Sequence, residues 1–188
     1  YHVFDAEQDR HVRGHHESLD RIRAALAHRE FVLHYQPKVN MRTGQVLGAE
    51  ALIRWQHPEQ GLLAPASFLP AVEDNPLGVE IGQWVLEDAI GQLARWNASG
   101  LDFHVSVNIG ARQLQQPQFV EHLRALLAAH PQLNPHQLEL EVLETSALAD
   151  MEQVSQVIEA CRQMGVRFAL DDFGTGYSSL TYLKRLRV

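Results

Sequence analysis

The chain has 188 residues, of which 45% are hydrophobic and 21% are charged, so it is long enough to bury the core of a soluble globular domain. Its net charge of −7 argues against binding to nucleic-acid polymers, and an anionic ligand would need metal ions or a local arginine. The single cysteine, Cys161, excludes an intrachain disulfide, and no apolar run approaches a membrane span, so we expect a cytoplasmic location.

Residues 1–29 are polar and rich in histidine. Leu19, Ile22 and Leu26 recur at helical spacing, which predicts a linker helix leading into a main domain formed by residues 30–188. The chain starts without an initiator methionine or a signal peptide, so we expect it to be a segment of a longer parent protein.

Strands are predicted where apolar residues cluster between turn signals. The predicted strands are residues 31–35, 46–55, 103–109, 138–142 and 168–170. Gln36-Pro37 would end the first strand, a turn would follow at residues 40–44, and residues 57–61 would form a loop after the second strand.

Helices are predicted between these strands from apolar stripes at helical spacing. The predicted helices are a short one beginning at residues 65–69, a long one over residues 81–96, and others over residues 117–127, 154–164 and 177–186. Gly100 and Gly165 would end two of them.

Strands that alternate with helices predict parallel β/α units. Glu50 lies within the second strand, and further polar residues lie at or near the ends of the third, fourth and fifth. These are Asn108, Glu141, Asp171 and Asp172. A β/α barrel builds its active site at such strand ends, whereas a doubly wound sheet favours a glycine-rich turn after its first strand, which this chain lacks. We therefore predict an α/β fold, a TIM-like β/α barrel.

The polar residues at the strand ends predict a divalent metal site. Their carboxylates and the amide of Asn108 are hard oxygen donors, which suit Mg²⁺ or Mn²⁺. Gathered at one barrel mouth, the carboxylates would repel one another without cations, and the number of donors fits two ions. Such a pair hydrolyses phosphodiesters. Arg54, four residues after Glu50 and on the same strand face, could hold a phosphate.

Five short motifs occur in order along the chain, each at a predicted strand. They are Tyr35-Gln36-Pro37, Glu50-Ala51-Leu52, Ser106-Val107-Asn108, Leu138-Glu139-Leu140-Glu141 and Asp171-Asp172-Phe173-Gly174-Thr175-Gly176. This order resembles the EAL-domain cyclic di-GMP phosphodiesterases, and the resemblance covers residues 31–188. It implies a β/α barrel, a hydrolase that converts cyclic di-GMP to linear pGpG with two Mg²⁺ or Mn²⁺ ions.

The resemblance also implies roles for individual residues. The ligands of one metal ion would be Glu50, Asn108, Glu141 and Asp171, and Asp171 and Asp172 would face the second ion. Glu50, Asp171 and Asp172 would be catalytic. Gln36, Leu52 and Arg54 match positions that contact the substrate.

The segment after the fifth strand resembles a regulatory loop of the family. Glu144 resembles a glutamate that braces this loop, and residues 172–179 are similar to the segment that joins the active site to a dimer interface. The loop residues carried over are Phe173, Gly174, Thr175 and Gly176. The resemblance therefore implies a homodimer. Leu143 departs from the family by replacing a usual threonine, which could alter the bracing of the loop.

The resemblance is incomplete at both ends. Residues 31–188 are fewer than the roughly 250 of a whole β/α barrel, so we expect the last strands to lie after Val188, with the barrel truncated at its C-terminal end. The resemblance to the family implies that a catalytic lysine and a further metal-site glutamate also lie after Val188. The N-terminal residues weakly resemble the tail of a GGDEF domain. An upstream GGDEF or sensory domain is therefore expected in the parent protein, which could itself be anchored to a membrane.

The residues leave two functions open. The first is an active phosphodiesterase, and the second is a catalytically inactive EAL domain that acts as a cyclic di-GMP receptor. Receptor-type members usually lack some metal ligands, whereas every ligand that this chain could carry is present, which favours the enzyme. An unrelated metal-dependent barrel is disfavoured by the order of the motifs.

Overall fold

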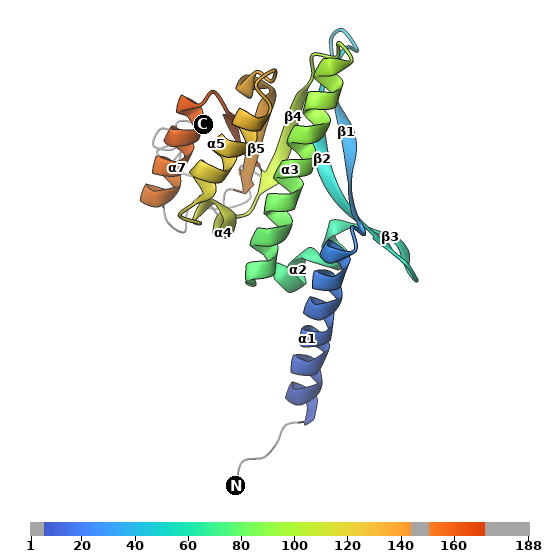
Figure 1. Cartoon of the computed structure of the whole chain (residues 1–188). Coiled ribbons are helices and arrows are strands. Elements are labelled where there is room, and N and C mark those ends of the chain that lie inside the picture. Colours follow the sequence, from blue (N-terminus) through green and yellow to red (C-terminus); the bar gives the residue numbers. More distant parts are fainter. Residues whose placement is uncertain (1–5, 144–150, 172–188) are drawn as a thin grey trace. The chain divides into compact units, whose positions relative to one another are not determined.

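The computed structural model describes residues 6–143 and 151–171 (Figure 1). The strands are β1 (Phe31–Val39), β2 (Val46–His57), β3 (Gly61–Leu63), β4 (His104–Ile109), β5 (Leu138–Leu143) and β6 (Arg167–Asp171). The α-helices are α1 (Ala6–Ala27), α2 (Leu69–Val72), α3 (Pro76–Ala98), α4 (Ala111–Leu114), α5 (Phe119–Ala129) and α7 (Met151–Gln163), and short 3₁₀ turns occupy Pro65–Ser67 and Pro135–Gln137. None of the helices in these residues is long and apolar enough to cross a membrane.

The chain divides into two compact units. One contains the described residues up to Val32 together with Ile53–Ile81, and the other contains Leu33–Leu52 and the described residues from Gly82 onward. The second unit carries the parallel part of the sheet, and the first carries α1 and the hairpin of β2 with β3.

The sheet has the strand order β1-β2-β4-β5-β6, with β3 paired to β2. The pairs β2–β4, β4–β5 and β5–β6 are parallel, which confirms the predicted β/α units. β1 and β2 instead form a hairpin, because their short connection is closed by a hydrogen bond from Asn40 N–H to Gln45 O at 2.8 Å and parallel neighbours need a longer crossover. Within the described residues the sheet does not close on itself.

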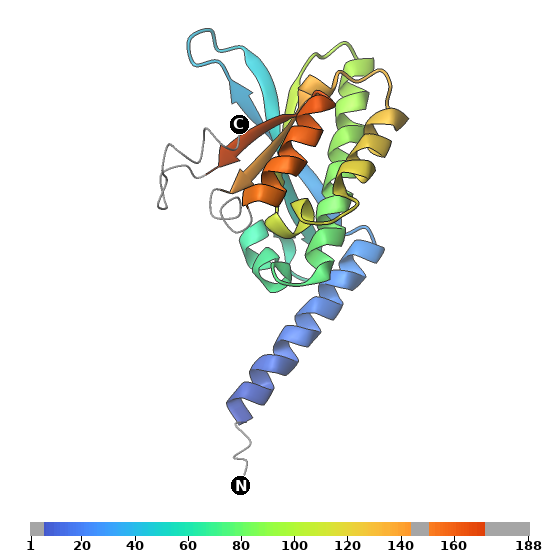
Figure 2. The same ribbon diagram turned by 90° about the vertical axis from the view of Figure 1, so that its left-hand side faces the viewer.

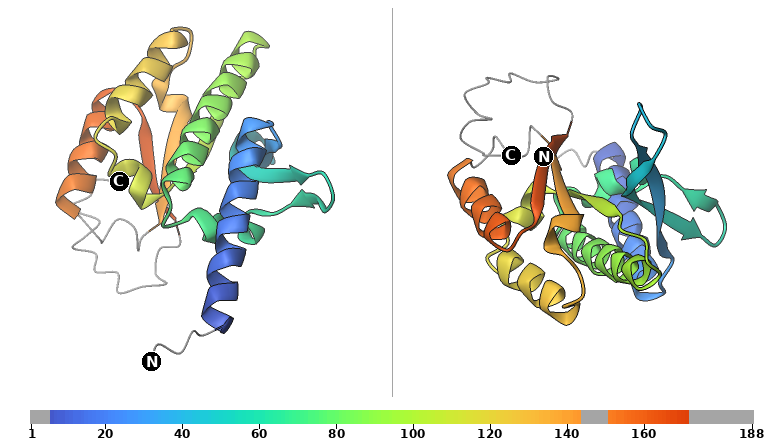
Figure 3. Two further views of the ribbon diagram at one scale, coloured as in Figure 1. Left: turned by 60° about the horizontal axis from the view of Figure 1, so that its bottom comes forward. Right: turned by 90° about the horizontal axis from the view of Figure 1, so that it is seen from above.

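In the second unit, helices cover one face of the sheet. Figure 2 and the view from above in Figure 3 show α5, α7 and α3 from Gly82 onward lying along one side of β4, β5 and β6. Alternate residues of β4 and β5 face these helices and are fully buried, as Val105, Val107 and Leu140 illustrate. The intervening residues point to the opposite face, which is where the polar side chains of these strands lie.

The predicted helix ends are confirmed by their glycines. Gly100, at φ +80°, follows α3, and the N–H of Leu101 bonds back to Trp96 O at 3.0 Å. Gly165, at φ +93°, follows α7 in the same way. Residues other than glycine rarely adopt this left-handed backbone, so each glycine ends its helix cleanly.

In the first unit, α1 packs through its C-terminal half. Leu19 and Ile22 are buried, as their helical spacing predicts. Glu30 accepts hydrogen bonds from Arg21 Nη2 at 2.7 Å and from Trp55 Nε1 at 2.9 Å, and these bonds lower the pKa of its carboxyl group. The helix is confirmed, while its role as a linker stays a prediction.

Several short elements differ from the sequence-based expectation. β1 does not end at Gln36-Pro37 but continues to Val39, because β1 lies at one end of the strand order, where a proline without an N–H is tolerated. Residues 57–61, expected as a loop, form the turn of a hairpin in which His57 pairs with Gly61. α4 was not predicted, since a single helical turn carries no periodic apolar pattern.

The register of β2 with β4 yields a stability prediction. Gly48 pairs with His104, and a Cβ atom on Gly48 would overlap the carbonyl oxygen of His104. Gly48→Ala should therefore destabilise the fold by about 1–3 kcal/mol, measured by thermal or urea unfolding. Gly91→Ala is the matched control, because its Cβ would meet only the Arg95 Nη1 at 3.6 Å and alanine favours a helix. Equal melting temperatures for the two variants would contradict the proposed close approach.

Candidate active site

The parallel register brings the predicted ligands to the same end of the sheet. Glu50 of β2 lies beside Ser106 of β4, and Asn108 lies beside Glu141 of β5. Asp171, half-buried at the end of β6, pairs with Leu143. Because the C-terminal ends of parallel strands share one edge, these side chains come from adjacent strands at one end of the unit.

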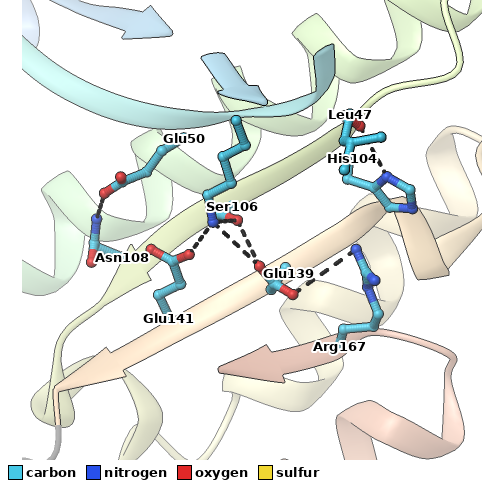
Figure 4. Close-up of polar contacts among 9 residues, drawn as sticks. Leu47, Glu50, His104, Ser106, Asn108, Glu139, Glu141 and Arg167 are labelled. Carbon is cyan, nitrogen blue, oxygen red and sulfur yellow. Dashed lines mark hydrogen bonds and ion pairs between the residues drawn. The ribbon is translucent and has the colours of Figure 1, made fainter. Parts of the chain in front are cut away.

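Glu50 and Asn108 contact each other directly. The Nδ2 of Asn108 donates a hydrogen bond to Glu50 Oε1 at 2.8 Å (Figure 4). The residues are distant in sequence and meet only because β2 and β4 pair in this register. The amide therefore orients a carboxylate that the sequence predicts to be a metal ligand.

Glu141 makes a contact that the sequence did not predict. Its side chain is largely buried, and its Oε1 accepts a hydrogen bond from Lys38 Nζ of β1 at 2.5 Å. A buried carboxylate without a partner is costly, and this ion pair supplies the partner.

Lys38 belongs to a larger polar network that includes Ser106 and Glu139. Its Nζ donates to Ser106 Oγ at 2.5 Å and to Glu139 Oε1 at 3.4 Å, and Ser106 Oγ in turn donates to Glu139 Oε1 at 2.8 Å. Arg167 Nη2 approaches Glu139 Oε2 at 3.9 Å (Figure 4). The alternation of β5 predicts that Glu139 and Glu141 share a face, and this is confirmed by their common partner.

The network shifts the pKa values of its members in opposite directions. Burial opposes the charged form of Lys38, but Glu141 and Glu139 outweigh this effect and raise the pKa of its ammonium group. Burial likewise opposes the ionised form of Glu139, but the Ser106 hydrogen bond and the charges of Lys38 and Arg167 lower its pKa. Both residues are therefore held in their charged forms at neutral pH.

The predicted substrate residues lie on β1 and β2. Gln36 is exposed, whereas Leu52 and Arg54 are half-buried and alternate with buried residues along β2. Arg54 Nη1 donates to the carbonyl oxygen of Ile53 at 2.9 Å, which orients the guanidinium group. The predicted residues Glu144, Asp172, Phe173, Gly174, Thr175 and Gly176 lie outside the described residues.

The chemistry of the donors fits a hard divalent cation. Glu50, Glu141 and Asp171 offer carboxylate oxygens and Asn108 an amide oxygen, and these are the donors that Mg²⁺ and Mn²⁺ prefer. Within residues 6–143 and 151–171, however, no three His, Cys, Asp or Glu side chains are grouped closely enough to hold a metal ion. Glu50 accepts a hydrogen bond from Asn108, and Glu141 accepts one from Lys38.

Comparisons with known proteins show the family to which the chain is similar. The family model described as "EAL domain" matches residues 19–188. The chain is 42% identical over 187 residues to the bifunctional diguanylate cyclase/cyclic di-GMP phosphodiesterase MucR of Pseudomonas aeruginosa, covering 99% of the chain and 27% of MucR. It is 38% identical over 188 residues to the cyclic di-GMP phosphodiesterase PdeR of Escherichia coli, covering 99% of the chain and 28% of PdeR.

A solved structure supports the fold. The PaMucR phosphodiesterase in complex with c-di-GMP superposes with a TM-score of 0.85 at 45% identity, over 90% of this chain and 68% of that one. The predicted TIM-like β/α architecture is therefore confirmed at the level of the fold. The chain spans about a quarter of the length of the curated relatives MucR and PdeR.

Proposed function

Because the chain belongs to the EAL domain family, we propose that it forms a phosphodiesterase domain that hydrolyses cyclic di-GMP to linear pGpG. The observation that carries this proposal is the hydrogen-bonded pair of Glu50 and Asn108, which has Glu141 next to it in the strand register. It combines hard oxygen donors from β2, β4 and β5 at one end of the sheet. The relatives MucR and PdeR are named as cyclic di-GMP phosphodiesterases.

Family membership implies dependence on divalent metal ions, and we propose two Mg²⁺ or Mn²⁺ ions. One would be held by Glu50, Asn108, Glu141 and Asp171, and the second would be faced by Asp171 and Asp172. When bound, such ions supply an activated water and stabilise charge on the leaving oxygen. Asn108 keeps the Glu50 carboxylate oriented through its own N–H donor.

Arg54, with Gln36 and Leu52, is proposed to contact the substrate. A guanidinium group carries five N–H donors, and Arg54 spends one of them on the Ile53 carbonyl oxygen. The group is thus anchored by its own strand and can still donate to a phosphate. Gln36 is exposed on β1, where its amide is accessible to a ligand.

The wider assembly follows from the same resemblance. We propose a homodimer formed through residues 172–179, which Glu144 would brace, and an upstream GGDEF or sensory domain in the parent protein. The name of MucR, which couples a diguanylate cyclase to a phosphodiesterase, supports the second point. A cytoplasmic location of this domain fits a nucleotide substrate.

Metal ligation is tested by isosteric substitution. In the full-length parent protein, Glu50→Gln or Asp171→Asn should lower kcat for cyclic di-GMP by more than about 100-fold, because each variant weakens the binding of an ion that contributes several kcal/mol. EDTA should stop hydrolysis, Mn²⁺ or Mg²⁺ should restore it, and the larger Ca²⁺ should bind but inhibit.

The control for charge is Glu80→Gln, which removes one carboxylate from the exposed surface of α3 and should leave activity unchanged. Hydrolysis by either ligand variant within about tenfold of the unsubstituted protein would contradict the two-metal site. Tight binding of cyclic di-GMP by the unsubstituted full-length parent protein without any turnover would instead support the inactive receptor.

The role of Arg54 is tested separately. Arg54→Ala should lower kcat/KM by about 10–100-fold, since a charge-assisted hydrogen bond contributes roughly 1.5–3 kcal/mol, and should leave Mn²⁺ affinity unchanged. Arg42→Ala, in the exposed β1–β2 turn, is the matched control. If Arg54→Ala also abolishes Mn²⁺ binding, measured by calorimetry, Arg54 supports the structure and does not bind phosphate.

A further inference from the structure

Lys38 occupies a position in which its ammonium group is fully coordinated. An ammonium group has three N–H donors, and Lys38 Nζ has three oxygen partners. These are Ser106 Oγ at 2.5 Å, Glu139 Oε1 at 3.4 Å and Glu141 Oε1 at 2.5 Å. The partners come from β4 and β5, whereas Lys38 comes from β1, so side chains of other strands determine where the charge sits.

We propose that Lys38 is a positioning residue for the proposed metal ligand Glu141: it holds one carboxylate oxygen of Glu141 so that the other oxygen is presented to a divalent ion. This inference rests on the proposed function, because it requires Glu141 to bind metal. It adds to that function a residue that the family resemblance did not assign.

The geometry at Glu141 supports this role. A carboxylate has two oxygens, and Lys38 engages Oε1. In Figure 4 the other oxygen lies on the side of Asn108 and Glu50, and Asn108 is the register neighbour of Glu141. The Lys38 contact therefore leaves the oxygen that faces the other predicted ligands available for a cation.

The charges around Lys38 indicate that it affects metal binding by orienting Glu141 and not mainly by its own charge. The ammonium of Lys38 is balanced by Glu139, which also accepts from Ser106 and lies near Arg167. The negative charge of Glu139 offsets part of the repulsion that the Lys38 ammonium would exert on an ion at Glu141. Glu139 and Ser106 fix the position of the Lys38 ammonium group through hydrogen bonds. Ser106 is only 2% exposed, so its side chain has little freedom to move.

Side chains that hydrogen-bond to metal-ligating carboxylates influence metal affinity by a typical factor. Their removal typically lowers metal affinity by about 10–100-fold, because the ligand loses its orientation. Lys38→Met should therefore weaken Mn²⁺ binding by this factor. The readout is calorimetric titration of the metal-free protein with Mn²⁺ alone, which does not depend on turnover.

Two further variants separate orientation from charge. Ser106→Ala removes one anchor of the ammonium group without changing any charge, so it should weaken Mn²⁺ binding in the same direction by a smaller factor. Arg167→Gln removes the same charge as Lys38→Met but contacts Glu139 and not Glu141, so Mn²⁺ affinity should stay within about threefold.

A double-substitution cycle tests whether Lys38 acts through Glu141. In a Glu141→Gln background the oriented ligand is already lost, so adding Lys38→Met should cause no further loss of Mn²⁺ affinity. An equal loss in both backgrounds would show that Lys38 acts by another route and would overturn the proposal.

The remaining outcomes are also decisive. Unchanged or tighter Mn²⁺ binding by a cooperatively melting Lys38→Met protein overturns the positioning role. If Lys38→Met fails to fold, the Mn²⁺ affinity of Ser106→Ala is the test, and unchanged affinity in that variant overturns the positioning role of Lys38.

Failure of this inference can be told apart from failure of the proposed function. If the unsubstituted parent protein binds Mn²⁺ and hydrolyses cyclic di-GMP while Lys38→Met binds Mn²⁺ equally well, only this inference fails. Absence of Mn²⁺ binding by the unsubstituted protein overturns the proposed function as well.

Discussion

The parallel register of β4 with its neighbours β2 and β5 is the constraint on which the site depends. Successive residues of a strand point to opposite faces of the sheet. The register therefore decides which side chains face the helices and which lie on the opposite face. Val105 and Val107 enter the core, while Ser106 and Asn108 point the other way. A shift of β4 by one residue would bury Asn108 and separate it from Glu50.

Largely buried acidic side chains are costly, and ion pairs with nearby basic side chains compensate for the cost at Glu139 and Glu141. Glu139 and Glu141 would repel each other if they stood alone, but Lys38 lies within hydrogen-bonding distance of both. Arg167 adds a second cation beside Glu139. The arrangement resembles the general pattern of metal centres, in which the groups behind the ligands determine how the ligands point.

Long elements were predictable because their patterns are periodic. The apolar stripe of α3 and the alternation of β5 identify those elements and show which residues share a face. The shorter elements were missed, since α4 and β3 span too few residues to establish a period. The end of β1 was misplaced because proline ends a strand only where its N–H would have been needed, and the sequence does not reveal that β1 lies at one end of the strand order.

The sequence by itself determined the α/β order, the family, and the residues expected at the strand ends, because local periodicity and ordered motifs are properties of the chain alone. Only the tertiary structure decided which of those side chains meet. Glu50 contacts Asn108, and Glu141 contacts Lys38, through pairings between segments far apart in the sequence. Such contacts depend on strand order and register, which arise from hydrogen bonding between strands and leave no periodic signal within either one.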